Sequence, residues 1–296
     1  MIQNCTDYES IIDTFCKVLL NDASPAVRAR AAAFLAKFTD AYAVPTLLKA
    51  LFDADSNVRT AVAETLGKVR AEAAIPGLLK TLEDSNPNVR SQAVQALGQI
   101  GSVAAAEGLL KILQADPVFQ VRAVAAEALG KLSHSSAITG LLKALHEDQD
   151  AQVRVNAAFA LGHFDDGTAI SGLLLALEDP DSNVREQTAS VIGNLKSPAS
   201  VPGLLETLEH MNPEVSYGAA IALSQIPSDL TISGLRRALH HLIPHVREHA
   251  AMALGKLGDT ASLPTLMELL EDPDNLVRYS AIKALGDVVM TSRSVA

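Results

Sequence analysis

A Val-Arg pair opens a helical pattern at nearly constant intervals along this chain. The pairs end at Arg28, Arg59, Arg90, Arg122, Arg154, Arg185, Arg247 and Arg278. The spacings are 31, 31, 32, 32, 31, 62 and 31 residues, and the gap of 62 residues is two periods with Ser216 at its midpoint. A fixed period of this length is the signature of a repeat architecture. The sequence therefore predicts nine repeats that cover nearly all of the 296 residues.

Each repeat contains two helical patterns joined by a short polar turn. IPGLLKTLED (75–84) and VRSQAVQALGQI (89–100) both place apolar residues on one helix face, and no segment alternates as a strand does. A unit of two helices cannot bury its apolar faces alone, whereas a stack of such units builds one continuous core. We therefore predict an all-α fold, a right-handed α-α superhelix that forms a single solenoid over residues 1–296.

Composition and recurring glycines point to closely packed helices. Aromatic residues make up 4% of the chain and there is no Trp, so the core must consist of Ala, Leu, Val and Ile. A glycine inside a helix costs about 1 kcal/mol relative to alanine. We expect close contact with a neighbouring repeat to explain the glycines of the second helices, which are Gly67, Gly98, Gly130, Gly162, Gly193, Gly255 and Gly286.

An aspartate lies six residues before seven of the repeat arginines. Each aspartate falls at the C-terminal end of a first helix and each arginine in the first turn of a second helix, and both charges oppose the helix dipole. We therefore expect the two to pair, within a repeat or with the next one. We call this set the Asp–Arg ladder: Asp53, Arg59, Asp84, Arg90, Asp116, Arg122, Asp148, Arg154, Asp179, Arg185, Asp272 and Arg278.

One repeat departs from this pattern. In EHMNPEVSYGAAIALSQIP (209–227) the arginine is replaced by Ser216, the aspartate by His210 and the glycine by Ser224, while the apolar positions stay in phase. Since the core is retained and only the residues between repeats change, we predict an altered joint at residues 209–249.

Histidines and one arginine gather in the same region. Five of the eight histidines, His210, His240, His241, His245 and His249, lie in repeats 7 and 8. A metal site, a pH-sensitive contact and ordinary surface or turn histidines are the alternatives, and we assign no metal ligand. Arg236 occupies a position where other repeats have leucine. We expect its stem to pack while its charge reaches water, or its guanidinium to pair with Asp229 or Glu206.

The second helices are expected to line a concave groove. From repeat 5 onward, large side chains replace small polar ones at groove positions, and aromatic residues and Met are typical anchors of binding surfaces. The alternative is that these side chains pack on neighbouring repeats as the superhelix tightens. The predicted partner-binding groove consists of Phe159, His163, Tyr217, Ile221, His249, Met252 and Tyr279.

The repeated phrases VRxxAxxALGxL and IPxLLxxLxD resemble HEAT repeats of the short, phycobilisome-lyase type over about residues 8–289. The resemblance implies a superhelix of helix pairs. Members of this repeat family include bilin lyases, phycobilisome-degradation factors, iron–sulfur assembly partners and scaffolds. Related deoxyhypusine hydroxylases carry His-Glu pairs as iron ligands, and this chain has only His146-Glu147 and the reversed pair Glu248-His249.

Charge and motifs favour a binding protein. The net charge is −10 and no extended basic cluster occurs, which excludes a typical nucleic-acid interface. The polar N-terminus and the lack of a long apolar run predict a cytoplasmic chain without membrane insertion. Phosphate loops, nucleophile elbows and HExxH motifs are absent from the sequence. We expect a non-catalytic scaffold without a cofactor that binds a protein partner, and the acidic surface suits a partner with a basic face.

The resemblance implies two other functions. The first is a bilin lyase or isomerase subunit, or a phycobilisome-associated factor, in which Tyr217, His249 and Tyr279 would hold a tetrapyrrole. The propionates of the bilin would then need basic residues, for which Arg247, Lys256 and Lys283 are the candidates. The second is an iron–sulfur assembly partner.

Overall fold

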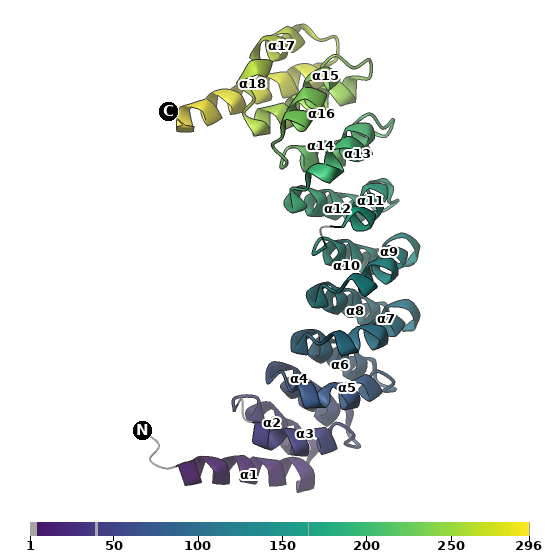
Figure 1. The fold of residues 1–296 in the computed structure, drawn as a ribbon, viewed down its shortest axis with the longest axis vertical. Coiled ribbons are helices and arrows are strands. Elements are labelled where there is room, and N and C mark those ends of the chain that lie inside the picture. Colours follow the sequence, from purple (N-terminus) through teal and green to yellow (C-terminus); the bar gives the residue numbers. More distant parts are fainter. Residues whose placement is uncertain (1–4, 39–40, 165, 296) are drawn as a thin grey trace. The chain divides into compact units, whose positions relative to one another are not determined.

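Every regular element in the described part of the chain is a helix. The computed structural model describes residues 5–38, 41–164 and 166–295, and no strand occurs in these ranges. Successive helices pair as the sequence predicts, with a short turn between the two helices of each repeat (Figure 1). The structure confirms an all-α solenoid fold built from two-helix repeats.

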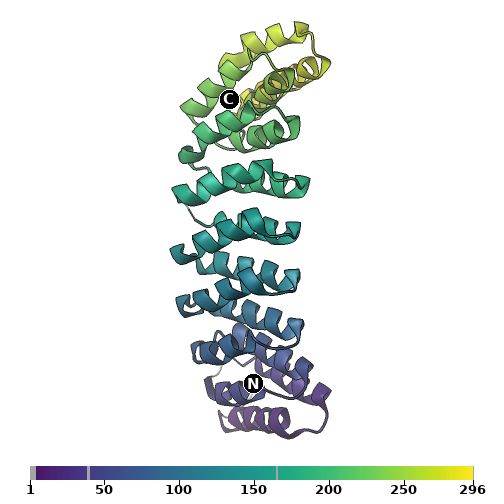
Figure 2. The ribbon, with the colours of Figure 1, turned by 90° about the vertical axis from the view of Figure 1, so that its right-hand side faces the viewer.

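The chain divides into two compact units, and each is described by itself. The N-terminal unit comprises Met1–Ala144 and Asp148–His163, and the C-terminal unit comprises Leu145–Glu147 and Phe164–Ala296. Within each unit the first helices form one layer and the second helices form another, and the repeats follow one another along the stack (Figure 2). The single solenoid over residues 1–296 stays a prediction.

The N-terminal unit holds the first ten α-helices. They are α1 (Cys5–Asn21), α2 (Pro25–Leu35), α3 (Val44–Ala50), α4 (Ser56–Lys68), α5 (Ile75–Thr81), α6 (Pro87–Ile100), α7 (Ala106–Ala115), α8 (Phe119–Leu132), α9 (Ile138–Glu147, whose last three residues belong to the other unit) and α10 (Ala151–Leu161). Short 3-10 turns precede four of the first helices: η1 (Ala41–Ala43), η2 (Glu72–Ala74), η3 (Val103–Ala105) and η4 (Ser135–Ala137).

The C-terminal unit continues the same alternation. Its α-helices are α11 (Gly167–Leu175), α12 (Ser182–Leu195), α13 (Val201–Leu208), α14 (Pro213–Leu223), α15 (Asp229–Ala238), α16 (Pro244–Leu257), α17 (Leu263–Glu268) and α18 (Asn275–Val295). Its 3-10 turns are η5 (Ala176–Glu178), η6 (Pro198–Ser200), η7 (Thr260–Ser262) and η8 (Leu269–Glu271).

Local sequence signals set where the second helices begin. The Asp55 carboxylate accepts hydrogen bonds from the backbone N–H groups of Asn57 and Val58 at the start of α4. Asn86 and Asn212 cap α6 and α14 in the same way, and each of these two helices has proline in its first turn. Side-chain capping satisfies N–H groups that have no partner within the helix, and proline needs no such partner.

The recurring glycines allow the second helices to lie very close together. A Cβ atom on Gly130 would lie 2.8 Å from the Cα atom of Ala160, and one on Gly255 would lie 2.7 Å from the Cα atom of Ala284. At Gly193 the added atom would instead meet the side chain of Gln225, at 2.7 Å. Close contact with a neighbouring repeat therefore explains these glycines, as the pattern predicts. The expectation was wrong for Gly286 on α18, where an added Cβ atom would meet nothing within 4 Å.

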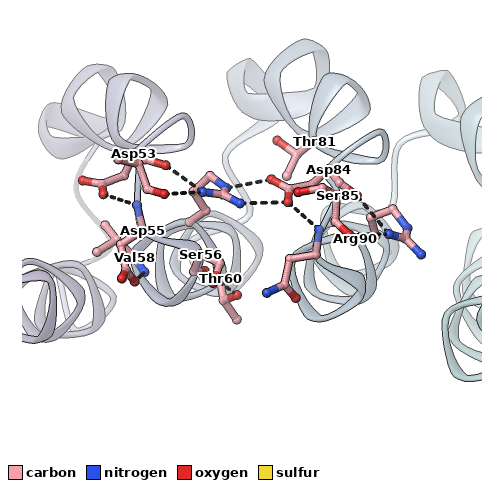
Figure 3. A network of polar contacts seen from close by, with 12 residues as sticks. Asp53, Asp55, Ser56, Val58, Thr60, Thr81, Asp84, Ser85 and Arg90 are labelled. Atoms are coloured by element: carbon pink, nitrogen blue, oxygen red, sulfur yellow. Dashed lines mark hydrogen bonds and ion pairs between the residues drawn. The ribbon is translucent and has the colours of Figure 1, made fainter.

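The Asp–Arg ladder connects successive repeats. Arg59 Nη1 donates to the backbone carbonyl of Asp53 in its own repeat, at 2.8 Å, and Nε and Nη2 donate to the carboxylate of Asp84 in the next repeat, at 2.6 and 2.9 Å (Figure 3). The same bidentate arrangement joins Arg28 to Asp53, Arg90 to Asp116, Arg122 to Asp148 and Arg247 to Asp272. Each arginine therefore ties the end of one first helix to the end of the next.

Candidate functional site

Ser216 replaces the ladder arginine with a fully buried hydroxyl on α14. Its Oγ atom donates to the carbonyl oxygen of Leu208, at 2.7 Å, and lies 3.0 Å from Nδ1 of His249 on α16. A carbonyl oxygen can only accept, so the serine proton is committed to Leu208. Nδ1 of His249 must therefore carry a proton and donate it to Ser216.

A second histidine takes over the other function of the missing arginine. In the regular ladder, an arginine donates to the carbonyl six residues before it, and for position 216 that residue is His210. Here Nε2 of His245 donates to the His210 carbonyl, at 3.0 Å. At this joint, contacts from Ser216, His245 and His249 thus replace one guanidinium.

Burial and nearby charge keep His249 neutral. Its side chain is 7% exposed, and burial together with the charge of His245 lowers its pKa from 6.5 to about 4. The rings of Tyr217 and His249 lie 5.3 Å apart between centroids. With Nδ1 occupied at Ser216 and no hydrogen bond to Nε2 among the described residues, Nε2 keeps a free lone pair near pH 7.

A cavity of about 350 Å³ opens beside this histidine. We call it the α14 pocket. Residues from α12, α14 and α16 line it, including Arg185, Glu186, Glu214, Tyr217, Ile221 and His249. Gly218 forms part of its wall, at a position where most other repeats carry a side chain. The pocket therefore lies on the second-helix face, at the joint where the ladder changes.

Arg185 lines the pocket, and both of its Nη atoms have partners. Its Nη1 atom donates to the carbonyls of Asp179 and Pro180, at 2.7 and 3.1 Å, and its Nη2 atom contacts the Glu214 carboxylate. Because His210 stands where the next ladder aspartate would be, Glu214 supplies the carboxylate instead. The one cation at the pocket is thus neutralised locally.

The geometry does not favour covalent catalysis by Ser216. Its Oγ atom is completely buried and receives a hydrogen bond from His249, whereas a general base would have to accept the serine proton. In the described part of the chain, no three His, Cys, Asp or Glu side chains converge as metal ligands. What the site offers is a pocket with a neutral acceptor, an aromatic wall and carboxylates at its rim.

The predicted groove residues fall into separate places. Tyr217, Ile221 and His249 meet in the α14 pocket. Phe159 and His163 line a cavity of about 310 Å³ within the N-terminal unit. On the last two second helices, Met252 is half-buried and Tyr279 is 67% exposed.

Two details of the sequence-based expectation were wrong. His249 was expected on an exposed face, but its ring is buried because Nδ1 turns inward to Ser216. For Arg236 we expected either a charge that reaches water or a pair with Asp229 or Glu206. Its side chain is 42% exposed, but the two candidate partners were wrong, because its Nε and Nη2 atoms bind the Asp259 carboxylate, at 2.8 and 2.5 Å. Asp259 precedes the first helix of the next repeat, so the guanidinium again connects successive repeats.

The pairing of Ser216 with His249 was missed, although the period contains a signal for it. The two residues are 33 positions apart, which is one repeat plus two residues. The same separation joins Asn156 to the Ala123 carbonyl and Thr65 to the Ala32 carbonyl. Neighbouring second helices therefore meet at this offset, and a search for polar pairs 33 residues apart would have found the site.

A larger cavity lies elsewhere, on the first-helix side of the N-terminal unit. It measures about 590 Å³ and is lined by Leu79, Gly108 and the regular Arg90–Asp116 pair. Arg90 and Asp116 are paired here as in the other joints, so the ladder is unchanged at this cavity. Within the described ranges, no helix has the length and apolar character needed to span a membrane.

Comparisons with known proteins place the chain in a family. HEAT repeats match residues 12–85, 69–130, 138–210 and 201–286, and the PBS lyase HEAT-like repeat matches residues 121–147. Comparison with curated proteins gives no significant match.

Solved structures share the fold at low identity. The karyopherin Kap121p bound to the extreme C-terminus of the protein phosphatase Cdc14p is 14% identical, with a TM-score of 0.62 over 97% of this chain and 42% of that one. Importin beta is 17% identical, with a TM-score of 0.56 over 96% and 47%. The CpcE–CpcF phycocyanin lyase complex from Nostoc sp. PCC7120 is 24% identical, with a TM-score of 0.48 over 76% and 92%. This chain spans less than half of either karyopherin, and these likenesses concern the fold alone. From the family matches, which cover most of its length, the chain belongs to the HEAT-repeat family.

Proposed function

We propose that this protein is a non-catalytic scaffold that binds a protein partner on the second-helix face of its C-terminal unit. The observation that carries the proposal is the α14 pocket, which occurs where the ladder is replaced and where Tyr217 is still 45% exposed. Half-exposed aromatic residues beside a preformed pocket are typical anchors of protein interfaces.

A further exposed aromatic side chain lies at the same repeat position as Tyr217. Tyr279 on α18 is 67% exposed and, like Tyr217, directly follows the position of the repeat arginine. HEAT-repeat proteins offer long faces of parallel helices, and the Kap121p complex shows one such protein holding the C-terminus of another. By analogy, an extended segment of a partner would lie across the second helices and insert a side chain into the pocket.

Quantitative affinity capture from the native organism tests the proposal. We expect Tyr217→Ala to lower the affinity for the captured partner by roughly 30-fold, the effect of losing an interface anchor worth about 2 kcal/mol. Met267→Ala is the matched control, because Met267 is 61% exposed in the same unit but lies on a first helix, α17. Equal capture by the wild type and the Tyr217 variant would remove the proposal.

The bilin alternative is tested in the same preparation. Arg247, one of its three candidate bases, is already bound by both carboxylate oxygens of Asp272. A scaffold without a tetrapyrrole site should leave the absorbance spectrum of phycocyanobilin unchanged, with or without the captured partner. A spectral change that disappears in Tyr217→Ala would favour the bilin alternative.

A further inference from the structure

The α14 pocket has walls that suit the stem of a long side chain. Tyr217, Ile221 and Pro213 supply apolar surface, and Gly218 contributes no side chain. A Cβ atom added to Gly218 would find Ala189 Cβ at 3.6 Å and Leu177 Cδ2 at 3.7 Å, which are ordinary contacts. A methyl group at position 218 would therefore fit without displacing these neighbours.

The polar groups that line the pocket are mainly hydrogen-bond acceptors. His249 lines the pocket and is neutral near pH 7. Nδ1 donates to Ser216, and Nε2 has no hydrogen-bond partner among the described residues. The exposed carboxylates of Glu186 and Glu214 lie at the rim, and the only cation, Arg185, is already bound to Glu214 and to two carbonyls. An anion would meet acceptors and carboxylates, whereas a cation with N–H groups would be attracted.

We propose that the α14 pocket binds an arginine side chain of the partner protein. Its methylene stem would pack on Ile221, and its guanidinium would stack on the ring of Tyr217 while donating to Nε2 of His249 and to the carboxylate of Glu186. This assignment rests on the proposed function and names the group that the partner inserts. Arginine suits the pocket better than lysine, because a planar guanidinium can stack on a ring while its five N–H groups donate in several directions.

A peptide titration followed by NMR tests the assignment. The probe is the capped pentapeptide Gly-Gly-Arg-Gly-Gly, and the readout is the imidazole Cε1–H resonance of His249, assigned from its loss in His249→Gln. We expect a saturable shift at pH 7. The same peptide with citrulline, which keeps the shape but not the charge, should bind at least about tenfold more weakly, because hydrogen bonds from charged donors are stronger. The lysine peptide should also bind more weakly.

Two variants show that the response comes from the pocket. Gly218→Leu should abolish the shift by filling the cavity, while Gly218→Ala, whose Cβ fits, should retain it. Glu186→Gln, an exposed substitution that leaves the core untouched, should weaken binding even if Gly218→Leu impairs folding. Equal binding of arginine and citrulline peptides, or an arginine response that persists in both Glu186→Gln and a folded Gly218→Leu, would overturn the assignment.

The outcome separates this inference from the proposed function. If Tyr217→Ala lowers partner capture but the arginine peptide leaves the His249 resonance unchanged, the face binds a partner and the arginine assignment is wrong. If the arginine peptide binds in the pocket but capture does not depend on Tyr217, the pocket chemistry stands and the proposed use of this face fails.

Discussion

At the scale of single residues, several weaker hydrogen bonds replace the ladder arginine at position 216. A ladder arginine makes charged hydrogen bonds to a carboxylate and donates to a carbonyl. The substitute consists of a buried serine and two histidines whose hydrogen bonds depend on where their protons lie. This exchange makes the joint sensitive to pH in a range where the ladder pairs stay charged.

His249 should make stability fall as the solution is acidified. Its folded-state pKa of about 4 lies below the ordinary value of 6.5, so between these values the unfolded chain binds more protons than the folded one. The stabilisation is complete above pH 6.5 and is lost as the pH falls to 4, by up to about 3 kcal/mol from this residue. Urea unfolding at pH 7 and pH 4.5, monitored on the C-terminal unit, measures the change.

The same measurement on variants identifies the titrating group. The groups around His249 are His245 on its own helix, Tyr217 on α14, and Arg185 and Glu186 on α12. His249→Gln should flatten the pH dependence, whereas His163→Gln, which changes an exposed ring in the other unit, should leave it intact. A wild-type slope in His249→Gln would assign the effect to another group.

At the scale of helices, pairs of small and large residues fix how close neighbouring elements lie. In the first-helix layer, Leu110 lies over Gly140 and Leu205 lies over Gly234, where a Cβ atom would be 2.3 and 2.4 Å from a leucine methyl carbon. The glycine position of the last repeat holds Thr265, and the leucine position of the repeat before it holds Arg236. Because the last repeat has no glycine against which a leucine could pack, Arg236 occupies the leucine position and binds Asp259.

The glycines of the second helices allow a matched comparison. Gly130 and Gly286 both lie eight residues after a repeat arginine, but a Cβ atom would meet the Ala160 backbone at 2.8 Å in the first case and nothing within 4 Å in the second. We expect Gly130→Ala to destabilise the protein by about 1–3 kcal/mol through overpacking. Gly286→Ala should stabilise α18 by up to about 1 kcal/mol through helix propensity. Thermal unfolding of both variants checks the opposite signs.

These examples show how far the sequence predicts the molecule. The period, the helix pairs and the need for glycine at most of the recurring positions follow from spacing, because successive repeats meet similar neighbours. Gly286 in the last repeat is the exception. The sequence also shows where the ladder residues are replaced, and two of the groove residues it names, Tyr217 and Ile221, line the α14 pocket. The sequence did not predict that His249 is buried against Ser216 or that Arg236 binds Asp259. Each contact depends on the identity of one residue in an adjoining repeat.

At the scale of the whole molecule, stability in a repeat protein is roughly the sum of the repeats and the interfaces between neighbours. In the N-terminal unit, the same arginine–aspartate ion pair recurs at successive interfaces between repeats, from Arg28 to Asp148. Hydrogen bonds from Arg59 lower the pKa of Asp84, which keeps this carboxylate charged in mild acid. In the C-terminal unit, Arg247 and Asp272 form the same ion pair. The interfaces on either side of α14 are joined instead by Arg185 with Glu214 and by Ser216 with His249.

Removing one arginine from the ladder should therefore open one interface and leave the others closed. In Arg90→Met, the carboxylate of Asp116, whose side chain is 2% exposed, keeps only the backbone N–H of Val118 as a partner. An uncompensated buried charge costs about 3–5 kcal/mol. Hydrogen exchange should show α6 and α8 losing protection at pH 7, with α16 and α18 unchanged.

Acid and a second substitution should both relieve that loss. Burial raises the pKa of Asp116, but hydrogen bonds from Arg90 and Val118 bring it below the ordinary value in the wild type. Without Arg90, one of the main causes that lower the pKa is lost, and the folded-state pKa of Asp116 rises relative to the wild type. The cost of Arg90→Met therefore shrinks as the pH falls and Asp116 becomes protonated. Adding Asp116→Asn removes the charge at every pH and should recover part of the stability at pH 7. If the double variant were as unstable as Arg90→Met at pH 7, the buried carboxylate would not be the source of the loss, and the arginine would act through its bonds to the Asp84 carbonyl alone.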